Sequence, residues 1–526
     1  EIKAGNFRKK IRNLPYRKNE VWFDGEGVCY RDGVKMMPFG WFSEQFRTPH
    51  KGLTIAQEYA DYYRSPEDVV KRCRRADKHG MGFIGMPFHS FDRKYTCAAL
   101  FGVPRMQGEF GLDNEIGRVQ KRMVRMFVEA AREEPGFFAY YLVDEPEGKG
   151  LNPDFFVAVK DYISELDPYH PTIVLNYSKS GIVKYKDCAD INCPDAYPIY
   201  YKDGKTKDPK RDVFDKARLA FDSGSASGWL VPQAFDWPVK DGDRIPRGPN
   251  YDEYREQIML ALAGNTKGFM LYTVTSYGVP SVDQNHSWRY VLDEVCEAWE
   301  TFLAPSEYLK TEILPKSAEK SVFAAVKRFG DDVILIVENV SYEPVRAVID
   351  ASLLPDKMYL SDVGETQISG QALDLSLAPS ETRVYRSRPW KFSIRKTKRN
   401  LAELEAARRK PGNLCLAPKF LTWGEIGNFA FVKTEPYYPR MELSSAYSQY
   451  PTRNVRNFSY FLQDGFDASY PYVDFHSWGP AGNDTAPWVK VDFGEKKRFS
   501  KVVLCRYRTD KGLYTLKSAV VEAGGK

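Results

Sequence analysis

The chain has 526 residues, which at roughly 150 residues per domain predicts about three domains. Hydrophobic residues make up 43% of it and charged residues 28%, a composition typical of a globular protein and not of a disordered one. The net charge of +6 is far from the basic footprint of a nucleic-acid-binding protein, so we expect no nucleic-acid partner. Aromatic residues reach 14%, which suits a protein that stacks rings on flat ligands such as sugars.

Targeting and cofactor signals are sparse. No run of about 18 apolar residues occurs, so we expect no transmembrane segment. The chain begins at Glu1 without an apolar leader; we expect an export signal to have been removed and the protein to be extracellular or periplasmic. The 8 cysteines and 6 histidines show neither a C-x-x-C pair nor a metal-ligand spacing, so we expect no metal and no organic cofactor for catalysis. The sequence leaves the oligomeric state open.

Strand-like and helix-like segments alternate through residues 1–305. Strands are predicted at 36–41, 81–88, 138–143, 172–176, within 189–200, at 229–235 and at 268–273. Helices are predicted at 65–79, 114–134, 154–166 and 250–263, with stop signals such as Gly80 and Gly264. This alternation predicts a (β/α)8 barrel as the first domain, residues 1–305. A doubly wound sheet is the second choice, disfavoured because no phosphate-binding glycine motif follows any of these strands.

The rest of the sequence changes character twice. Short apolar runs separated by Asp, Gly, Asn and Pro turns predict an all-β sandwich over residues 306–390. The runs lie at 322–326, 333–337, 345–349, 373–377 and 382–385. Residues 391–412 are basic and helix-prone, which indicates a linker. From 413 to 526 the chain is again strand-like and aromatic, so we expect a third folded domain there.

The most informative segment is 138–146, where an aromatic and aliphatic strand ends in Asp144, Glu145 and Pro146. A run of this length bounded by proline suits a strand buried on both faces. Burying carboxylates at its end is costly without partners, so such groups tend to have shifted pKa values and to act as acid, base or nucleophile. The structural alternative is that Asp144 caps the next helix and Glu145 is a solvated loop residue.

The working groups of a (β/α)8 barrel lie at the carboxyl ends of its strands, and this rule selects candidates. In chain order they are Trp41, Glu44, His89, Asp144, Glu145, Asn176, Asp195, Tyr197, Gln233, Asp236, Trp237 and Tyr272. Paired carboxylates between aromatic walls are what cleavage of a glycosidic bond requires, so we expect a carbohydrate substrate. The structural alternative makes His89 a hydrogen-bonded structural histidine, Asp195 a turn residue and both tryptophans core residues.

Short motifs in the barrel region resemble those of clan A glycoside hydrolases. The matching segments are 38–41 (PFGW), 141–146 (YLVDEP), 167–171 (DPYHP), 195–198 (DAYP) and the helix-to-strand segment 253–268. The resemblance implies that Glu145, at the end of strand four, is the general acid/base. It also implies a nucleophilic glutamate at the end of strand seven. This chain has Gln233 there, and a neutral amide cannot act as that nucleophile.

Three explanations of Gln233 stay open. The strand count is off by one, which moves the second carboxylate to Asp195 or Asp236, with Glu44 behind them. Alternatively, the enzyme inverts configuration through a more distant carboxylate. The third explanation is that the barrel has lost catalysis, which gives a non-catalytic glycan-binding or adhesion protein as the alternative function. A second carboxyl about 5–10 Å from Glu145 would favour the enzyme.

The last two domains carry resemblances of their own. The sandwich is similar to the β-domain that often follows such barrels as structural support. Residues 413–526 resemble the discoidin-like (factor V/VIII type C) galactose-binding fold through 413–417 (NLCLA), Asp464-Gly465 and 488–494 (WVKVDFG). That resemblance implies a carbohydrate-binding domain with a structural calcium ion, and because the pattern runs short we expect the domain to be truncated. The sequence therefore predicts an exported, multi-domain glycoside hydrolase.

Overall fold

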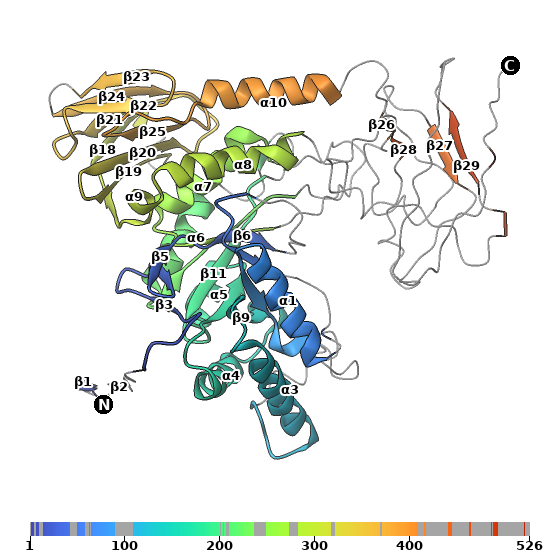
Figure 1. The fold of residues 1–526 in the computed structure, drawn as a ribbon. Coiled ribbons are helices and arrows are strands. Elements are labelled where there is room, and N and C mark those ends of the chain that lie inside the picture. The colour runs from blue at the N-terminus through green and yellow to red at the C-terminus, as the bar shows by residue number, and fades with distance from the viewer. Residues whose placement is uncertain are drawn as a thin grey trace.

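The computed structural model describes most of the chain up to the end of helix α10 at Arg408 (Figure 1). The described ranges are 14–42, 50–57, 65–89, 109–199, 210–235, 249–272, 282–316, 321–368 and 371–408, with a few single residues besides. Short strands lie outside them: β1 (Ile2–Ala4), β2 (Phe7–Lys9), β12 (Tyr201–Lys202), β13 (Lys205–Thr206), β26 (Cys415–Leu416), β27 (Arg440–Leu443), β28 (Leu462–Gln463) and β29 (Val489–Asp492). The predicted domain at 413–526 falls almost wholly outside the described residues and stays a prediction.

Eight parallel strands form a closed ring in the first domain. In order they are β6 (Phe39–Phe42), β7 (Ile55–Gln57), β8 (Gly82–Gly85), β9 (Phe137–Asp144), β10 (Thr172–Asn176), β11 (Ile191–Ala196), the interrupted seventh strand β14 (Ser227–Gly228) and β15 (Val231–Pro232), and β16 (Phe269–Leu271). The ring closes because β16 pairs with β6, while a bridge from Gln233 to Tyr272 joins the seventh strand to the eighth. A parallel ring of eight strands in this order agrees with the predicted (β/α)8 barrel.

Helices cover the outside of the ring (Figure 1). They are α1 (Pro66–Lys78), α3 (Glu115–Ala131), α4 (Pro153–Leu166), α5 (Lys179–Lys184), α6 (Arg211–Asp222), α7 (Tyr251–Ala263), α8 (Val282–Glu297) and α9 (Trp299–Leu303), with short 3-10 turns η1 (Pro87–His89) and η3 (Pro146–Lys149). Asn250 and Glu253 form a capping box that fixes the start of α7. α7 is buried on nearly all sides because strands of the next domain cover the face that the barrel leaves free.

Side chains fill the inside of the ring, because alternate residues of each strand point inward. The inner cluster includes Phe42, Ile55, Ile84, Phe138, Tyr141, Ile173, Leu175, Cys193, Trp229, Val231 and Met270. An N-terminal meander of β3 (Val21–Phe23), β4 (Cys29–Arg31) and β5 (Val34–Met36) contributes Val21 and Cys29 to the same cluster. Val21 N also donates to Tyr169 O, just ahead of β10, so the meander closes the N-terminal end of the barrel. The carboxyl ends of the strands face the other way.

The observed strands differ from the predicted strands in two places. The predicted strand 36–41 divides into β5 and β6 around Pro38, which has no N–H to donate to a ladder. β7 has no counterpart among the predicted strands, because three residues are too few to show a periodicity. With β7 counted, Glu145 follows the fourth strand and Gln233 the seventh, so the predicted strand numbers hold and a miscount does not explain Gln233. His89 follows the third strand and not the second.

Two antiparallel sheets follow the barrel. The first has the order β17-β19-β20-β25-β22-β23 and the second the order β18-β21-β24. Their bounds are β17 (Ser306–Tyr308), β18 (Thr311–Leu314), β19 (Val322–Phe329), β20 (Asp332–Asn339), β21 (Val345–Asp350), β22 (Lys357–Leu360), β23 (Gly364–Gln367), β24 (Ala372–Leu377) and β25 (Thr382–Arg386). Both sheets contribute to one hydrophobic cluster, and the five predicted apolar runs coincide with β19, β20, β21, β24 and β25.

The basic segment after the sheets is a helix, α10 (Ile394–Arg408), which leads away from them alongside α8 (Figure 1). Leu401 belongs to the hydrophobic cluster between the ring and its helices. Lys398 Nζ lies 2.8 Å from Asp252 Oδ1 in the first turn of α7. The predicted linker is therefore helical and is held against the barrel by apolar and ionic contacts.

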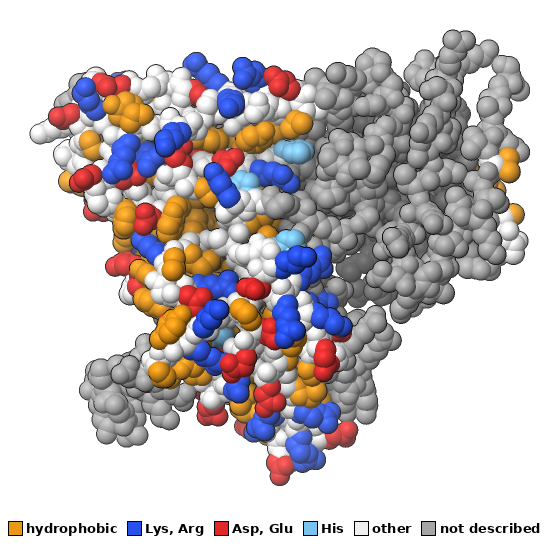
Figure 2. All heavy atoms as spheres, viewed as in Figure 1, with side chains coloured by type: hydrophobic (Ala, Val, Ile, Leu, Met, Phe, Trp, Pro, Cys, Tyr) orange, Lys and Arg blue, Asp and Glu red, His pale blue; other side chains and the backbone are white. Residues whose placement is uncertain are grey.

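Figure 2 shows Lys and Arg side chains interspersed with Asp and Glu over the visible described surface. Within the described ranges, no helix is both long and apolar enough to cross a membrane. The same ranges hold no group of three or more His, Cys, Asp or Glu side chains suited to a metal ion. The thiols of Cys29, Cys73, Cys188, Cys193 and Cys296 are free.

Candidate active site

Two carboxyl groups meet at the carboxyl end of the barrel, one from the fourth strand and one from the sixth. Glu145 directly follows β9, and Asp195 lies near the end of β11, where it is 3% exposed. The two side chains act on each other's pKa, and Tyr197 acts on the pKa of Asp195 as well. Two neighbouring carboxyls that act on each other in this way lose their protons as a pair and not as independent groups.

The backbone at Glu145 is in an uncommon conformation. Its φ of 47° and ψ of 57° lie in the left-handed region, which costs a non-glycine residue about 1–3 kcal/mol. Glu145 N still donates to Leu175 O at 3.1 Å, so the residue remains tied to β10 as the chain turns out of the sheet. Backbone strain of this kind is typical of functional sites.

The surroundings of the pair favour its protonated forms. Burial raises the pKa of Glu145, and the charge of Asp144 raises it further, against the hydrogen bond with Asp195 and the charge of Lys149. Burial raises the pKa of Asp195 well above its usual range, and the charge of Glu145 adds to the rise. Lys216 opposes it, with Nζ 3.0 Å from Asp195 O. A carboxyl pair that keeps a proton at pH values where isolated carboxyls are ionised is suited to general acid/base chemistry.

Further hydrogen bonds hold the loop that carries Glu145. The Tyr141 hydroxyl donates to Asp144 Oδ1 at 2.8 Å, and Lys149 Nζ donates to Asp144 O at 2.5 Å. Glu147 Oε1 accepts from Tyr177 N at 2.8 Å, which links the loop after β9 to the segment after β10. Asp144 therefore lies beside the pair with a fixed orientation, and its charge acts on Glu145.

Aromatic rings line the same end of the barrel. Ring centroids of Phe42 and Tyr141 are 5.5 Å apart, and those of Phe42 and Tyr272 are 5.4 Å apart. Phe235 lies 5.0 Å from Tyr197 and 5.4 Å from Tyr272, again edge to face. These five rings, which we call the aromatic wall, come from the first, fourth, sixth, seventh and eighth strands or from the residues directly after them. They form a connected apolar lining next to the carboxyl pair, and such rings are surfaces on which sugars stack.

Two predicted site residues have their side chains occupied by other contacts. The Gln233 amide donates to the carbonyl oxygens of Ile199 and Phe235, both at 3.0 Å, and accepts from Ile199 N at 2.8 Å. Both ends of this amide therefore bind the backbone. Asn176 lies at the position of β10 that faces the helices, where its Nδ2 donates to Asn192 Oδ1 at 3.1 Å. Neither side chain joins the carboxyl pair.

The remaining predicted residues fall into two groups. Trp41 is 2% exposed and packs edge to face against Trp288 of α8 at 5.2 Å, so it lies on the outer side of the ring. The side chains of Glu44, His89, Asp236 and Trp237 are outside the described residues, and their predicted roles stay predictions. The predicted residues that the structure brings together are Asp144, Glu145, Asp195, Tyr197 and Tyr272.

Three members of the aromatic wall are not among the predicted site residues: Phe42, Tyr141 and Phe235. Strand alternation is the signal that could have found them. Trp41 and Phe42 are consecutive at the end of one strand, and only one of two consecutive residues points into the barrel. The sequence rule that selects strand ends does not say which of the two does, and the structure shows that it is Phe42.

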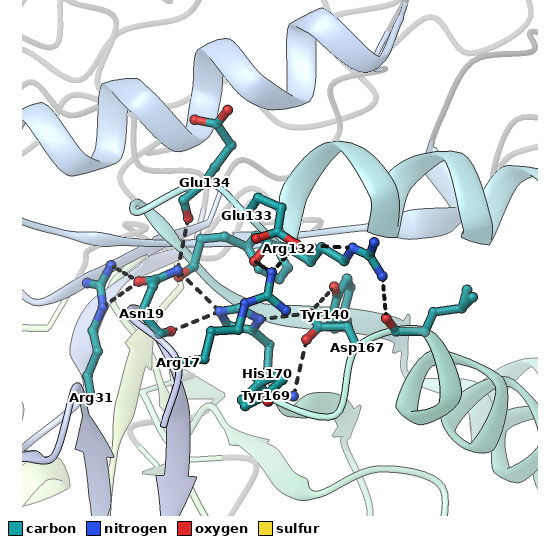
Figure 3. A network of polar contacts seen from close by, with 12 residues as sticks. Arg17, Asn19, Arg31, Arg132, Glu133, Glu134, Tyr140, Asp167, Tyr169 and His170 are labelled. Carbon is teal, nitrogen blue, oxygen red and sulfur yellow. Dashed lines mark hydrogen bonds and ion pairs between the residues drawn. The ribbon is translucent and has the colours of Figure 1, made fainter. Parts of the chain in front are cut away.

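A second buried carboxylate lies at the opposite end of the barrel (Figure 3). Asp167 Oδ2 accepts from the Tyr140 hydroxyl at 2.6 Å and lies 2.7 Å from His170 Nδ1. His170 Nε2 lies 2.9 Å from Asn19 O, and Asn19 Nδ2 donates to Phe137 O at 2.8 Å. Although burial opposes it, the hydrogen bonds with His170 and Tyr140 hold the pKa of Asp167 below its usual value. This network joins the N-terminal segment to the barrel and is structural, as expected for that face.

Comparison with known proteins identifies no relative by sequence: no protein-family model and no curated protein matches the chain. Among solved structures, it is similar to an alpha-amylase from Geobacillus thermoleovorans complexed with acarbose, with 10% identity, a TM-score of 0.42, and 66% of this chain and 98% of that chain covered. It is also similar to a GH30 endoxylanase from Clostridium papyrosolvens C71, with 11% identity, a TM-score of 0.39, and coverage of 67% and 96%.

Proposed function

We propose that the protein is a glycoside hydrolase in which Glu145 is the general acid/base. The observation that supports this is the pair of Glu145 and Asp195, which act on each other's pKa at the carboxyl end of an eight-stranded parallel ring, next to the aromatic wall. Glycosidic cleavage needs two carboxyl groups in different protonation states and flat apolar surfaces for the sugar. The raised pKa of both carboxyls supports the retention of one proton in the range where an acid is needed.

In the proposed reaction, the proton of the pair moves from the Glu145 carboxyl to the glycosidic oxygen as the bond between that oxygen and the anomeric carbon breaks. The leaving group departs as an alcohol, and both carboxyls of the pair are then ionised. Their charge, together with that of Asp144, stabilises the positive charge that develops on the sugar ring. Water then adds to the anomeric carbon and returns one proton to the pair, which restores the enzyme.

Asp195 is the proposed second carboxylate, ahead of Asp236 and Glu44. It is the described carboxyl, besides Asp144, whose charge and that of Glu145 act on one another, as expected of two groups that work as a pair. Catalytic groups commonly reach their working geometry only in the complex with substrate.

The alternative function is glycan binding without cleavage. It is favoured by Gln233, which ends the seventh strand with both ends of its amide bound to the backbone. An amide held in this way is neither a nucleophile nor a base. In this alternative the aromatic wall binds the sugar, and the carboxyl pair serves only as a hydrogen-bonding partner.

The experiment compares Glu145→Gln with the wild type on a panel of aryl glycosides and polysaccharides. Glu165→Gln, on the exposed face of α4, is the matched control and should behave as the wild type. For poor leaving groups, Glu145→Gln should lose roughly 10²- to 10⁴-fold in rate, the range that general acid catalysis provides. For dinitrophenyl glycosides, whose leaving group needs no proton, the loss should be far smaller. Equal activity of variant and wild type would exclude Glu145 as the acid, and glycan binding without any wild-type turnover would favour the alternative.

Other parts of the chain carry proposals of their own. We propose that 306–390 form a supporting β-sandwich and that 413–526 form a discoidin-like carbohydrate-binding domain with a structural calcium ion. An extracellular or periplasmic location would expose both to polysaccharide. Pull-down of the full chain by insoluble polysaccharides, with and without a calcium chelator, tests the last domain; binding that is indifferent to the chelator would remove calcium from the proposal.

A further inference from the structure

Gln57, the last residue of β7, is a fully buried polar side chain inside the barrel. Strand alternation places it there: Ile55, two residues earlier, belongs to the inner hydrophobic cluster, whereas Ala56 belongs to the outer one. Neither Oε1 nor Nε2 of Gln57 has a hydrogen-bond partner in the described part of the chain. An unpaired buried carboxamide is destabilising, so its presence in a barrel interior calls for an explanation.

The strands on either side explain why the amide is unpaired. Phe42 on β6 and Ile84 on β8 lie in register with Gln57, and both belong to the inner cluster. Their side chains offer neither a donor nor an acceptor. Phe42 is also a member of the aromatic wall, in contact with Tyr141 and Tyr272. The amide of Gln57 therefore lies beside that wall, at the end of the barrel that carries Glu145.

The other buried glutamines in the described part of the barrel have hydrogen-bond partners, whereas Gln57 has none there. Gln233 binds the backbone through both ends of its amide. Gln257 Oε1 accepts from Gln233 N at 2.9 Å, and its Nε2 donates to Glu253 O at 3.2 Å. Among the described residues, Asn176 Oδ1 is unpaired as well, but its Nδ2 is bound to Asn192, whereas both ends of the Gln57 amide are unpaired. An unpaired amide beside the proposed sugar-binding surface points to a partner on the ligand.

We propose that Gln57 binds hydroxyl groups at the most deeply buried edge of the bound saccharide. This inference rests on the proposed carbohydrate substrate and extends it to the kind of sugar that is selected. A carboxamide offers an N–H donor and an oxygen acceptor side by side, which match two neighbouring hydroxyls of a sugar ring. A sugar that lacks one of these hydroxyls leaves the amide unpaired again, and sites of this kind reject such analogues strongly. Gln57 is thus a specificity-determining residue that excludes deoxy sugars.

The test uses Gln57→Met in the full chain, with Gln57→Leu as a second variant of similar size. Gln257→Met, which removes a paired amide, is the matched control. Without saccharide, the Gln57 variants should melt at a higher temperature than the wild type and Gln257→Met at a lower one. On the aryl glycoside that the wild type cleaves best, Gln57→Met should lose about tenfold in kcat/KM. On the monodeoxy analogue that lacks the paired hydroxyl, Gln57→Met and the wild type should be equal.

Two results would overturn the inference. The first is an equal loss of kcat/KM from wild type to Gln57→Met on every monodeoxy analogue. The second is a melting temperature below that of the wild type in both Gln57 variants. If the wild type cleaves glycosides but the effect of Gln57→Met does not depend on which hydroxyl is missing, the inference fails and the proposed function stands. If the wild type cleaves no glycoside, calorimetry measures the binding of the same glycosides and their monodeoxy analogues to the wild type and to Gln57→Met. Weaker binding to Gln57→Met than to the wild type then supports the inference without catalysis, while equal or undetectable binding overturns it.

Discussion

Asp167→Asn tests whether the two ends of the barrel have the separate roles assigned to them. Asp167 is 1% exposed, and its carboxylate accepts from the Tyr140 hydroxyl at 2.6 Å and from Tyr169 N at 3.1 Å, besides its 2.7 Å contact with His170. Asparagine keeps the shape of the side chain but removes the charge. Whichever way its amide is turned, one of these partners meets an NH2 group or loses a charged acceptor.

The expected loss is large because the group is buried. In the variant, both the Tyr140 hydroxyl and Tyr169 N lose a charged acceptor in a buried site. Single hydrogen bonds to a charged group contribute about 1.5–3 kcal/mol each, so Tyr140→Phe should lose about that amount and Asp167→Asn more. Asp161→Asn, on the exposed side of α4, is the matched control and should lose less than about 0.5 kcal/mol.

Denaturant unfolding followed by tryptophan fluorescence measures these differences, and the specific activity of the folded protein is measured alongside. Asp167→Asn should keep wild-type activity per folded molecule, since its network lies away from Glu145. The pKa of Asp167 is lowered, so its stabilisation is fully present above the unfolded pKa of about 3.9 and is lost as the pH falls through the lower folded pKa. Unchanged stability of Asp167→Asn at neutral pH, or lost activity in a fully folded variant, would refute the reasoning.

Three further predictions concern the site, the domain contact and the barrel packing. Asp144→Asn removes a charge that raises the pKa of Glu145, so the alkaline limb of the pH profile of kcat/KM should move to lower pH. Burial raises the pKa of Glu256 to about 7, so wild-type stability should fall by about 3 kcal/mol as the pH rises from about 4.5 to 7, and Glu256→Gln should flatten that slope in unfolding curves. Gly136→Ala would put a Cβ 1.8 Å from a backbone oxygen of α1 and should abolish soluble expression, whereas Gly25→Ala, with nothing within 4 Å, should express as the wild type.

The barrel could be predicted because capping residues and stop signals mark the ends of its helices in the sequence. The helix expected at 65–79 is α1 (Pro66–Lys78), and the one expected at 250–263 is α7 (Tyr251–Ala263) with its Asn250 cap. Such signals are local, so they can be recognised without knowing which elements pack against the helix. The strand β7 could not be predicted in the same way, because three residues carry no period and its position is set by pairing with β6 and β8.

The members of the site could be predicted better than its geometry. Glu145 and Asp195 follow from the rule about strand ends, but β10 lies between their strands, so their contact depends on the register and lean of three strands together. A shift of one residue exchanges the two faces of a strand. That is why Trp41, which the sequence favours, packs against a helix while its neighbour Phe42 lines the barrel. Gln57 was not predicted as a site residue because its strand, β7, was not predicted.

The direction of each pKa shift separates a carboxyl that serves the fold from one that serves a reaction. A lowered pKa, as at Asp167, means that the folded state stabilises the charge. A raised pKa, as at Glu145, means that the folded state holds the proton more tightly than the unfolded chain, so stability falls as the pH rises above the unfolded pKa of about 4.3. Glu145→Gln removes that ionisation and should be at least as stable as the wild type in denaturant unfolding at neutral pH. A loss of stability comparable to that of Asp167→Asn would make Glu145 a structural residue and take away the basis of the proposed reaction.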